Sequence, residues 1–233
     1  MSDSSSLESL LKERGLAFTI CQVEPVNWNK EWESSFRPVT VTDEKTGDAL
    51  VHIRASFHPP FGKAMYELEV NPKMSFGTGH HATTRLMMQA MGRLDMKGKR
   101  VVDFGTGTGI LAILAEKMGS SYILASDCDP GCMENSKENF KLNGCQRIEW
   151  LLSDVFPATE KPDIILANIN LNVILQNIPS ITAVGRSGTE ILFSGILKTD
   201  EDQLVTALTE NKIINKRVDN EGDWIVIYAS ITH

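Results

Sequence analysis

Three glycines with the spacing G-x-G-x-G directly follow an apolar run in RVVDFGTGTGIL, at Gly105, Gly107 and Gly109. Glycine permits positive φ angles and lets the main chain approach a ligand closely. The helix expected to follow offers free N–H groups at its N-terminus. Asp127 comes 22 residues after Gly105 and ends the next apolar run, where a carboxylate can accept both hydroxyls of a ribose. This pattern predicts a cofactor that contains adenosine.

The residues around the glycines indicate which adenosine cofactor is bound. A dinucleotide loop reads G-x-G-x-x-G, but the sixth position counted from Gly105 is Ile110. Asp103 lies two residues before the first glycine, where its carboxylate would repel a pyrophosphate but would suit an ammonium and a sulfonium group. The sequence therefore favours S-adenosylmethionine and disfavours an NAD-dependent oxidoreductase.

Two further polar residues follow the next two apolar runs. Asp154 in LLSDVF can accept the amino group of adenine, or it can cap a helix or a turn. Asn168 in IILANIN can hold a substrate amine through its amide oxygen and the following backbone carbonyl, which would direct the amine lone pair at the methyl group. Its alternative role is the cap of the next helix.

The tetrapeptide FGTG occurs a second time, 28 residues earlier, in KMSFGTGHHATTR. The recurrence is either chance, or both copies contact one ligand. The neighbouring pair His80 and His81 could suggest a metal, but no carboxylate or third histidine stands at ligand spacing. We expect no metal.

The elements that position these residues alternate regularly from residue 82 onward. Apolar strands alternate with helices, which predicts an α/β fold with a mostly parallel sheet covered on both faces. The last two strands read as a hairpin around 220–222, which predicts an antiparallel edge. The strands are expected near 100–104, 122–126, 148–153, 162–169, 189–196, 212–219 and 223–231, with helices near 82–94, 109–119, 131–144, 171 onward and 199–211.

The first 70 residues show no such regular alternation of strands and helices. Residues 7–15 read as a short helix and 16–23 as a strand, and Trp28, Trp32 and Phe36 would share one helical face. A hairpin over 39–55 and a strand over 66–70 follow. We expect residues 1–70 to form a partial substrate-recognition domain with a linker, and residues 71–233 to form the cofactor-binding domain.

Composition excludes several classes of protein. The 233 residues carry a formal net charge of −7, which argues against sequence-independent binding to a nucleic-acid backbone. The four cysteines form no C-x-x-C pair, so we expect reduced thiols in a cytoplasmic protein instead of disulfides or a zinc site. The polar start is no secretory signal, and no run is long and apolar enough for a membrane span.

The chain resembles the ribosomal protein L11 methyltransferases, which are class I S-adenosylmethionine enzymes. The resemblance runs from about Trp28 to the C-terminus, and FGTGHHATT is its most specific string. The resemblance implies a Rossmann-like, seven-stranded sheet and methylation of amino groups, of lysine or an α-amine, on a large-subunit ribosomal protein. The matching strings are NWNKEWESSFRP, PKMSFGTGHHATTRL, VVDFGTGTGILAILA, DCDP, LANIN and LFSGIL.

The family uses its FGTG-H-x-x-TT segment as a flap against the bound cofactor, so the resemblance implies that both FGTG copies contact one molecule. Phe76 would close over the methionine or adenine, and Thr78 or Thr84 would hydrogen-bond the cofactor. The family match carries over Thr84, Gly105, Asp127 and Asn168 as cofactor contacts, with Asn168 also catalytic.

The chain departs from the family pattern at two places. Thr106 and Thr108 stand where family loops often read G-C-G-S-G, a conservative change. About 27 residues precede the tryptophan helix, so we expect a shortened form of the domain that docks the ribosomal protein. A monomer is expected. The alternatives are a methyltransferase for a small molecule, a nucleic acid or another protein, and a cofactor-binding relative without activity.

Overall fold

The computed structural model describes residues 10–15, 19, 36–71, 73, 75–158 and 161–232. The chain divides into two units, Met1–Ser35 and Phe36–His233. In the first unit the backbone is helical over residues 10–13, within the helix expected at 7–15. Apart from residue 19, the strand expected at 16–23 lies outside the described residues, as does most of the tryptophan helix, including Trp28 and Trp32.

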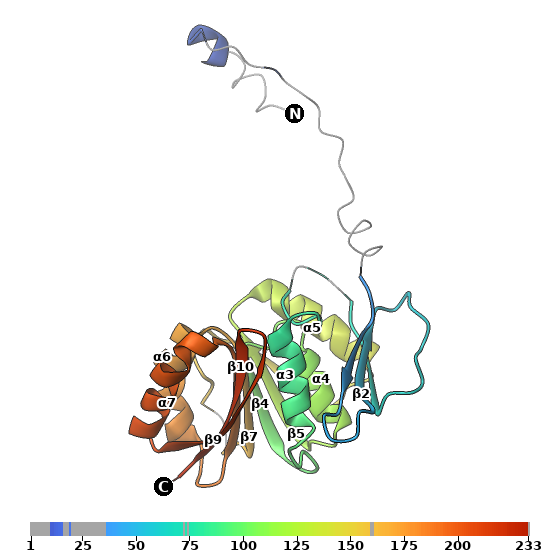
Figure 1. Cartoon of the computed structure of the whole chain (residues 1–233). Coiled ribbons are helices and arrows are strands. Elements are labelled where there is room, and N and C mark those ends of the chain that lie inside the picture. Colours follow the sequence, from blue (N-terminus) through green and yellow to red (C-terminus); the bar gives the residue numbers. More distant parts are fainter. Residues whose placement is uncertain are drawn as a thin grey trace. The chain divides into compact units, whose positions relative to one another are not determined.

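The second unit is built on a seven-stranded sheet with the order β6-β5-β4-β7-β8-β10-β9 (Figure 1). The five strands from β6 to β8 are parallel, and β10 runs antiparallel to both β8 and β9. This order confirms the predicted mostly parallel sheet with its antiparallel C-terminal hairpin. The strands are β4 (Arg100–Phe104), β5 (Tyr122–Asp127), β6 (Ile148–Leu152), β7 (Ile164–Asn168), β8 (Glu190–Leu197), β9 (Ile213–Glu221) and β10 (Trp224–Ile231).

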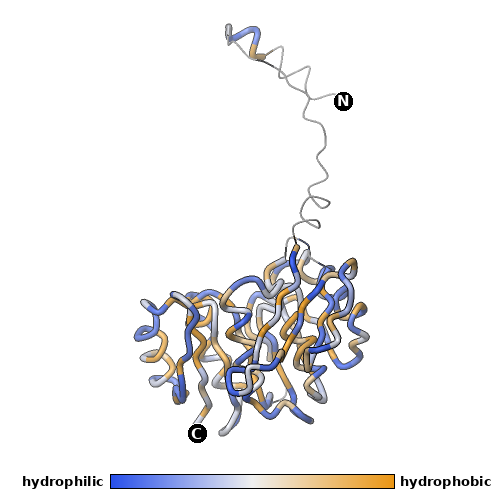
Figure 2. Tube along the Cα trace, turned by 45° about the vertical axis from the view of Figure 1, so that its right-hand side comes forward, coloured by the Kyte–Doolittle hydropathy of each residue, from blue (hydrophilic) through white to orange (hydrophobic). Residues whose placement is uncertain are grey.

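Helices cover both faces of this sheet. Successive strand residues point to opposite sides, so the apolar side chains of each strand contribute to a core on either face. Val101 belongs to the core under α3 and α4, whereas its neighbour Val102 belongs to the core under α6 and α7. The apolar strands inside and the polar turns outside are visible in Figure 2. The helices are α3 (Ala82–Met91), α4 (Ile110–Lys117), α5 (Pro130–Leu142), α6 (Leu171–Val184) and α7 (Glu201–Glu210), with a short 3₁₀ turn η1 (Lys198–Asp200) before α7.

A smaller sheet consists of β1 (Val39–Thr42), β2 (Ala49–Arg54) and β3 (Tyr66–Glu69). β1 and β2 form the predicted antiparallel hairpin, whereas β3 pairs parallel to β2. Buried side chains of this sheet, such as Ile53 and Leu68, belong to the same core as α3 and α4. Residues 36–70 therefore pack as part of the second unit, and a functional boundary near residue 70 stays a prediction.

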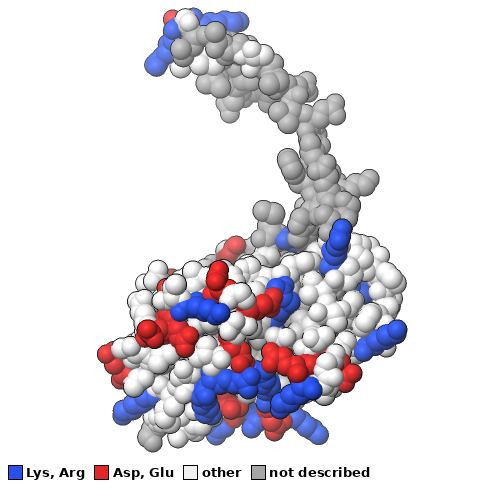
Figure 3. Space-filling model, viewed as in Figure 1, with Lys and Arg blue, Asp and Glu red and all other residues white. Residues whose placement is uncertain are grey.

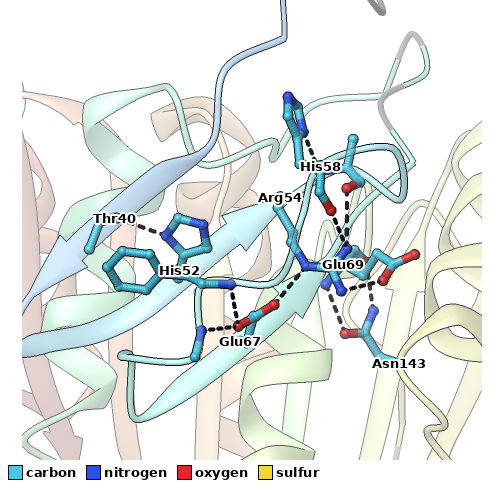
Figure 4. A network of polar contacts seen from close by, with 10 residues as sticks. Thr40, His52, Arg54, His58, Glu67, Glu69 and Asn143 are labelled. Atoms are coloured by element: carbon cyan, nitrogen blue, oxygen red, sulfur yellow. Dashed lines mark hydrogen bonds and ion pairs between the residues drawn. The ribbon is translucent and has the colours of Figure 1, made fainter.

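A polar network fixes the segment that connects β2 to β3 and leads toward the first FGTG copy (Figure 4). Arg54 bridges Glu67 at 2.6 Å and Glu69 at 2.9 Å. Hydrogen bonds from Arg54 and from loop N–H groups hold the pKa of Glu67 below its usual value. At the end of β3, Asn143 accepts from the Glu69 N–H and donates to the Glu69 carbonyl. Since Asn143 caps α5, the small sheet is tied directly to a helix of the large one.

Ion pairs hold α3 against the C-terminal hairpin. Arg85 pairs with Glu221 of β9, and Arg93 pairs with Asp219 of β9 and with Glu44 of the β1–β2 turn. Positive and negative side chains adjoin one another over the lower part of the face in Figure 3. These pairs fix the position of α3, whose N-terminus directly follows the first FGTG copy.

Within the described residues, no helix is long and apolar enough to cross a membrane.

Candidate active site

A cavity of about 850 Å³ lies where β4, β5 and β7 end and where the two FGTG segments meet. This is the carboxyl edge of the parallel strands, where α/β sheets bind their ligands. Six of the predicted site residues line it: Phe76, Gly105, Gly107, Asp127, Asp154 and Asn168. The remaining lining residues are Ser75, His81, Thr83, Phe104, Cys128, Asp129, Cys132, Ser153, Ile169, Asn170, Val173, Gln176, Gly195 and Trp224.

The glycine loop needs its glycines for two reasons. Gly105, Gly107 and Gly109 have φ values of 76°, 55° and 81°, in the left-handed region that side chains disfavour. A Cβ atom at Gly105 would also lie 2.2 Å from the Ile169 side chain, and one at Gly107 would lie 2.4 Å from the Phe76 carbonyl oxygen. The loop is therefore packed against both the first FGTG segment and Ile169, which directly follows β7.

The first FGTG copy is hydrogen-bonded to Thr108, the residue that directly follows the second copy. The Thr108 N–H donates to the Phe76 carbonyl at 2.9 Å, and the Thr108 hydroxyl donates to the Gly77 carbonyl at 2.5 Å. The Thr108 carbonyl in turn accepts from the Asn139 amide of α5 at 2.9 Å. Thr108, at which the loop departs from the family pattern, thus joins the two copies into one wall of the cavity.

The Asp127 carboxylate lies at the end of β5 and is oriented by backbone N–H groups. Its Oδ2 accepts from Gly107 at 2.8 Å, and its Oδ1 accepts from Asp129 at 3.1 Å. A carboxylate has about four acceptor positions, so lone pairs stay available for two hydroxyls of a ligand in the cavity.

Asp103 does not line the cavity but lies buried behind the glycine loop. Its Oδ2 accepts from the Thr106 hydroxyl at 2.6 Å and from the Ala112 N–H at 3.2 Å, which ties the loop to the first turn of α4. No hydrogen-bond partner for its Oδ1 is found among the described residues. Burial raises the pKa of Asp103 to about 7.

The raised pKa of Asp103 gives a testable dependence of stability on pH. Between the unfolded value of 3.8 and the folded value of about 7, the native protein holds a proton that the unfolded chain has released. The free energy of unfolding therefore falls as the pH rises through this range. We expect Asp103→Asn to remove this component and to be roughly 2–4 kcal/mol more stable than the wild type at pH 8 but not at pH 4.

Urea denaturation of the cofactor-free protein at several pH values would measure this effect. Asp95→Asn serves as the control because Asp95 is exposed. The role given to Asp103 would be wrong if its asparagine variant kept the pH dependence of the wild type.

Two threonines expected as cofactor contacts also lie outside the cavity lining. The Thr78 hydroxyl bonds to His80 Nδ1 at 3.0 Å. Thr84 is buried in the first turn of α3, and its hydroxyl has no hydrogen-bond partner among the described residues. Direct contact of Thr78, Thr84 or Asp103 with a cofactor stays a prediction.

Asn168 ends β7 and lines the cavity, and its side-chain oxygen is an unsatisfied acceptor. Its amide Oδ1 is buried, and no described residue donates a hydrogen bond to it. The alternative role as a helix cap does not apply, because Asn170 caps α6 and accepts from the Val173 N–H at 3.1 Å. A buried acceptor without a donor destabilises a protein unless a ligand satisfies it. A donor group of a ligand that reached Asn168 Oδ1 would satisfy this acceptor.

Asp154 follows β6 and lies exposed at the cavity. No helix begins there in the described part of the chain, so its alternative role as a helix cap does not apply.

Sequence reasoning missed the aromatic side of the cavity. His81 lies edge-on to both Phe76, with ring centroids 5.3 Å apart, and Trp224, at 4.8 Å. Trp224 begins β10 and lies beside the cavity because β10 pairs with β8, where Trp224 is opposite Leu197. His81 is the N-cap of α3, and the described residues contain no group of three potential metal ligands.

Residues 3–232 match the family model described as Ribosomal protein L11 methyltransferase (PrmA). The chain is 39% identical over 193 residues to the ribosomal protein L11 methyltransferase of Phocaeicola vulgatus, covering 82% of this chain and 66% of the relative. For that of Chlorobaculum parvum the identity is 37% over 229 residues, covering 94% of this chain and 77% of the relative.

A solved structure is similar as well. The ribosomal protein L11 methylase of Lactobacillus delbrueckii subsp. bulgaricus superposes with a TM-score of 0.72 and 31% identity, covering 78% of this chain and 95% of that chain. The chain spans about two thirds of the length of the first curated relatives that it matches, between 65% and 69%.

Proposed function

The chain belongs to the ribosomal protein L11 methyltransferase family, and from this premise we propose that it is an S-adenosylmethionine-dependent N-methyltransferase. Its acceptor would be an amino group, of lysine or an α-amine, on a large-subunit ribosomal protein in the cytoplasm. The observation that carries the proposal is Asn168, a residue that lines the cavity beside the glycine loop and whose buried Oδ1 has no donor among the described residues.

The residues around the cavity fit S-adenosylmethionine. Asp127 would hold the ribose hydroxyls, Asp154 the adenine amino group, and Gly105 and Gly107 would allow close approach of the backbone. The cavity residues Asp127, Asp129 and Asp154 supply negative charge for a cationic ligand. When bound, S-adenosylmethionine supplies a methyl group on a sulfonium, which is already activated for transfer to a nucleophile.

The task of the protein is then to present a neutral amine in the correct orientation. A lysine amine has a pKa near 10.4 and must lose a proton before its lone pair can react, which desolvation in the cavity favours. Asn168 Oδ1, with the backbone carbonyl that follows it, would accept N–H groups of the amine and direct the lone pair at the methyl group.

His81 lines the cavity but is not oriented as a base through Nδ1. The Thr83 N–H donates to His81 Nδ1 at 3.3 Å, so a neutral His81 carries its proton on Nε2. We therefore propose that water, and not a dedicated general base of the protein, accepts the proton that the substrate amine loses.

The test is intact-mass spectrometry of purified ribosomal protein L11 after incubation with this 233-residue chain and S-adenosylmethionine. Mass gains in steps of one methyl group are the expected result, with peptide mapping to identify the amines. Unchanged mass, with cofactor binding demonstrated by calorimetry, would contradict the proposed acceptor and favour a small molecule or another protein.

A further inference from the structure

The helix α5 carries two asparagines one turn apart, and both amides bond to the backbone of the segment that leaves β3. Asn143 bonds to the N–H and the carbonyl of Glu69, and Asn139 Oδ1 accepts from the Asn71 N–H at 2.8 Å. Four residues of a helix rise about 6 Å and two residues of an extended chain span about 6.6 Å, so the two steps match. Residues 69–71 are therefore held along α5 just before the first FGTG copy.

Asn139 also bonds to the glycine loop. Its Nδ2 donates to the Thr108 carbonyl at 2.9 Å, and the side chain is 0% exposed. The end of the loop rests on the same helix, because a Cβ atom at Gly109 would lie 2.3 Å from the Phe140 ring. One buried amide thus holds both the segment before the first FGTG copy and the residue that follows the second copy.

The amide of Asn139 lies behind the cavity, since Asn139 is not one of the lining residues. Its effect on a ligand would pass through Thr108, whose N–H and hydroxyl bond to the Phe76 and Gly77 carbonyls. Loss of the amide would leave the carbonyl of a fully buried residue without its donor, which is unfavourable unless the loop moves. The positions of the loop and of the first FGTG segment therefore depend on one side chain outside the cavity.

We propose that Asn139 is a positioning residue for S-adenosylmethionine, which acts through Thr108 to keep the glycine loop and the first FGTG segment in the arrangement that binds the cofactor. The inference rests on the proposed function for the identity of the cofactor. It assigns cofactor affinity to a residue of α5 outside the cavity lining. Methyl transfer from cofactor that is already bound does not depend on this residue.

The experiment measures the affinity of Asn139→Ala for S-adenosylhomocysteine by calorimetry. The Kd should rise by about 10-fold, because the loop loses the donor that fixes the Thr108 carbonyl. The KM for S-adenosylmethionine should rise by a similar factor, whereas kcat at saturating cofactor should change by less than about 2-fold. All titrations are made at a temperature at which urea denaturation shows the variants to be folded.

Asn143→Ala is the matched control, because Asn143 lies one turn further along α5 and also makes two bonds to the segment that leaves β3. Among the described residues its amide bonds otherwise only to the Asn139 carbonyl and not to the glycine loop. Its Kd should stay within about 2-fold of the wild type. An equal rise in both variants would assign the effect to release of residues 69–71 and would overturn the inference.

Asn139→Leu gives the second test, because leucine fills the space of the amide but has no hydrogen-bonding group. It replaces Asn139→Ala if the alanine variant is unfolded at the assay temperature. An unchanged Kd in a folded variant, or a fall in kcat at saturating cofactor as large as the rise in Kd, would overturn the inference. If the wild type binds S-adenosylhomocysteine but methylates no amine, the proposed function fails, and the calorimetric comparison still decides the role of Asn139.

Discussion

Replacement of Asn168 by alanine is expected to lower kcat for amine methylation by about 100-fold or more, because the reacting amine loses the acceptor that orients its lone pair. The Kd for the cofactor should change by less than about 3-fold, since Asp127 and the glycine loop are unaffected. Methyl transfer would be measured by mass spectrometry at saturating acceptor, and cofactor binding by calorimetry with S-adenosylhomocysteine.

Asn211→Ala provides the matched control, because Asn211 is a half-buried asparagine that caps α7 away from the cavity. A loss of cofactor affinity as large as the loss of kcat would assign Asn168 to cofactor binding instead. An unchanged kcat would remove its catalytic role.

Replacement of Gly107 by alanine is expected to weaken cofactor binding by about 100-fold. The added Cβ atom would lie 2.4 Å from the Phe76 carbonyl oxygen, so the two FGTG copies would have to separate. Movement of the Gly107 N–H would also release the Asp127 carboxylate, to which it donates at 2.8 Å. A misplacement of about 1 Å in a preorganised site is enough for an effect of this size.

Calorimetric titration with S-adenosylhomocysteine would measure this loss. Gly98→Ala controls for backbone strain, because Gly98 has a φ of 72° and open space around a Cβ atom. If Gly98→Ala weakened binding equally, the effect would be one of general destabilisation, and the contact between the FGTG copies would not be its cause.

The sequence was sufficient to predict the elements after residue 82, because apolar periodicity and turn residues agree there at each step. It was also sufficient to place Asp127 and Asn168 at strand ends, since parallel strands share one carboxyl edge. The pattern alone could not decide between Asn168 and Asn170 as the cap of α6. The structure decides it through the hydrogen bond from Val173 to Asn170.

Other parts of the site depend on how the strands pair and pack in three dimensions, which a single sequence does not show. The sequence did not indicate that the Asp103 carboxylate is buried and bonded to Thr106 and Ala112, whereas its contact with a cofactor stays a prediction. Trp224 is brought to the cavity by the pairing of β10 with β8, and Gly195 lines the cavity where one residue of β8 is bulged out of that pairing. These features follow from contacts between segments far apart in sequence, so propensity and periodicity carry no signal for them.

The hydrogen bonds between Thr108 and the Phe76–Gly77 backbone have a thermodynamic consequence for ligand binding. They order this wall of the cavity when the chain folds, before a ligand arrives. The conformational entropy lost in fixing the wall therefore belongs to folding and not to binding. A ligand that enters a preorganised wall keeps more of its contact energy as affinity.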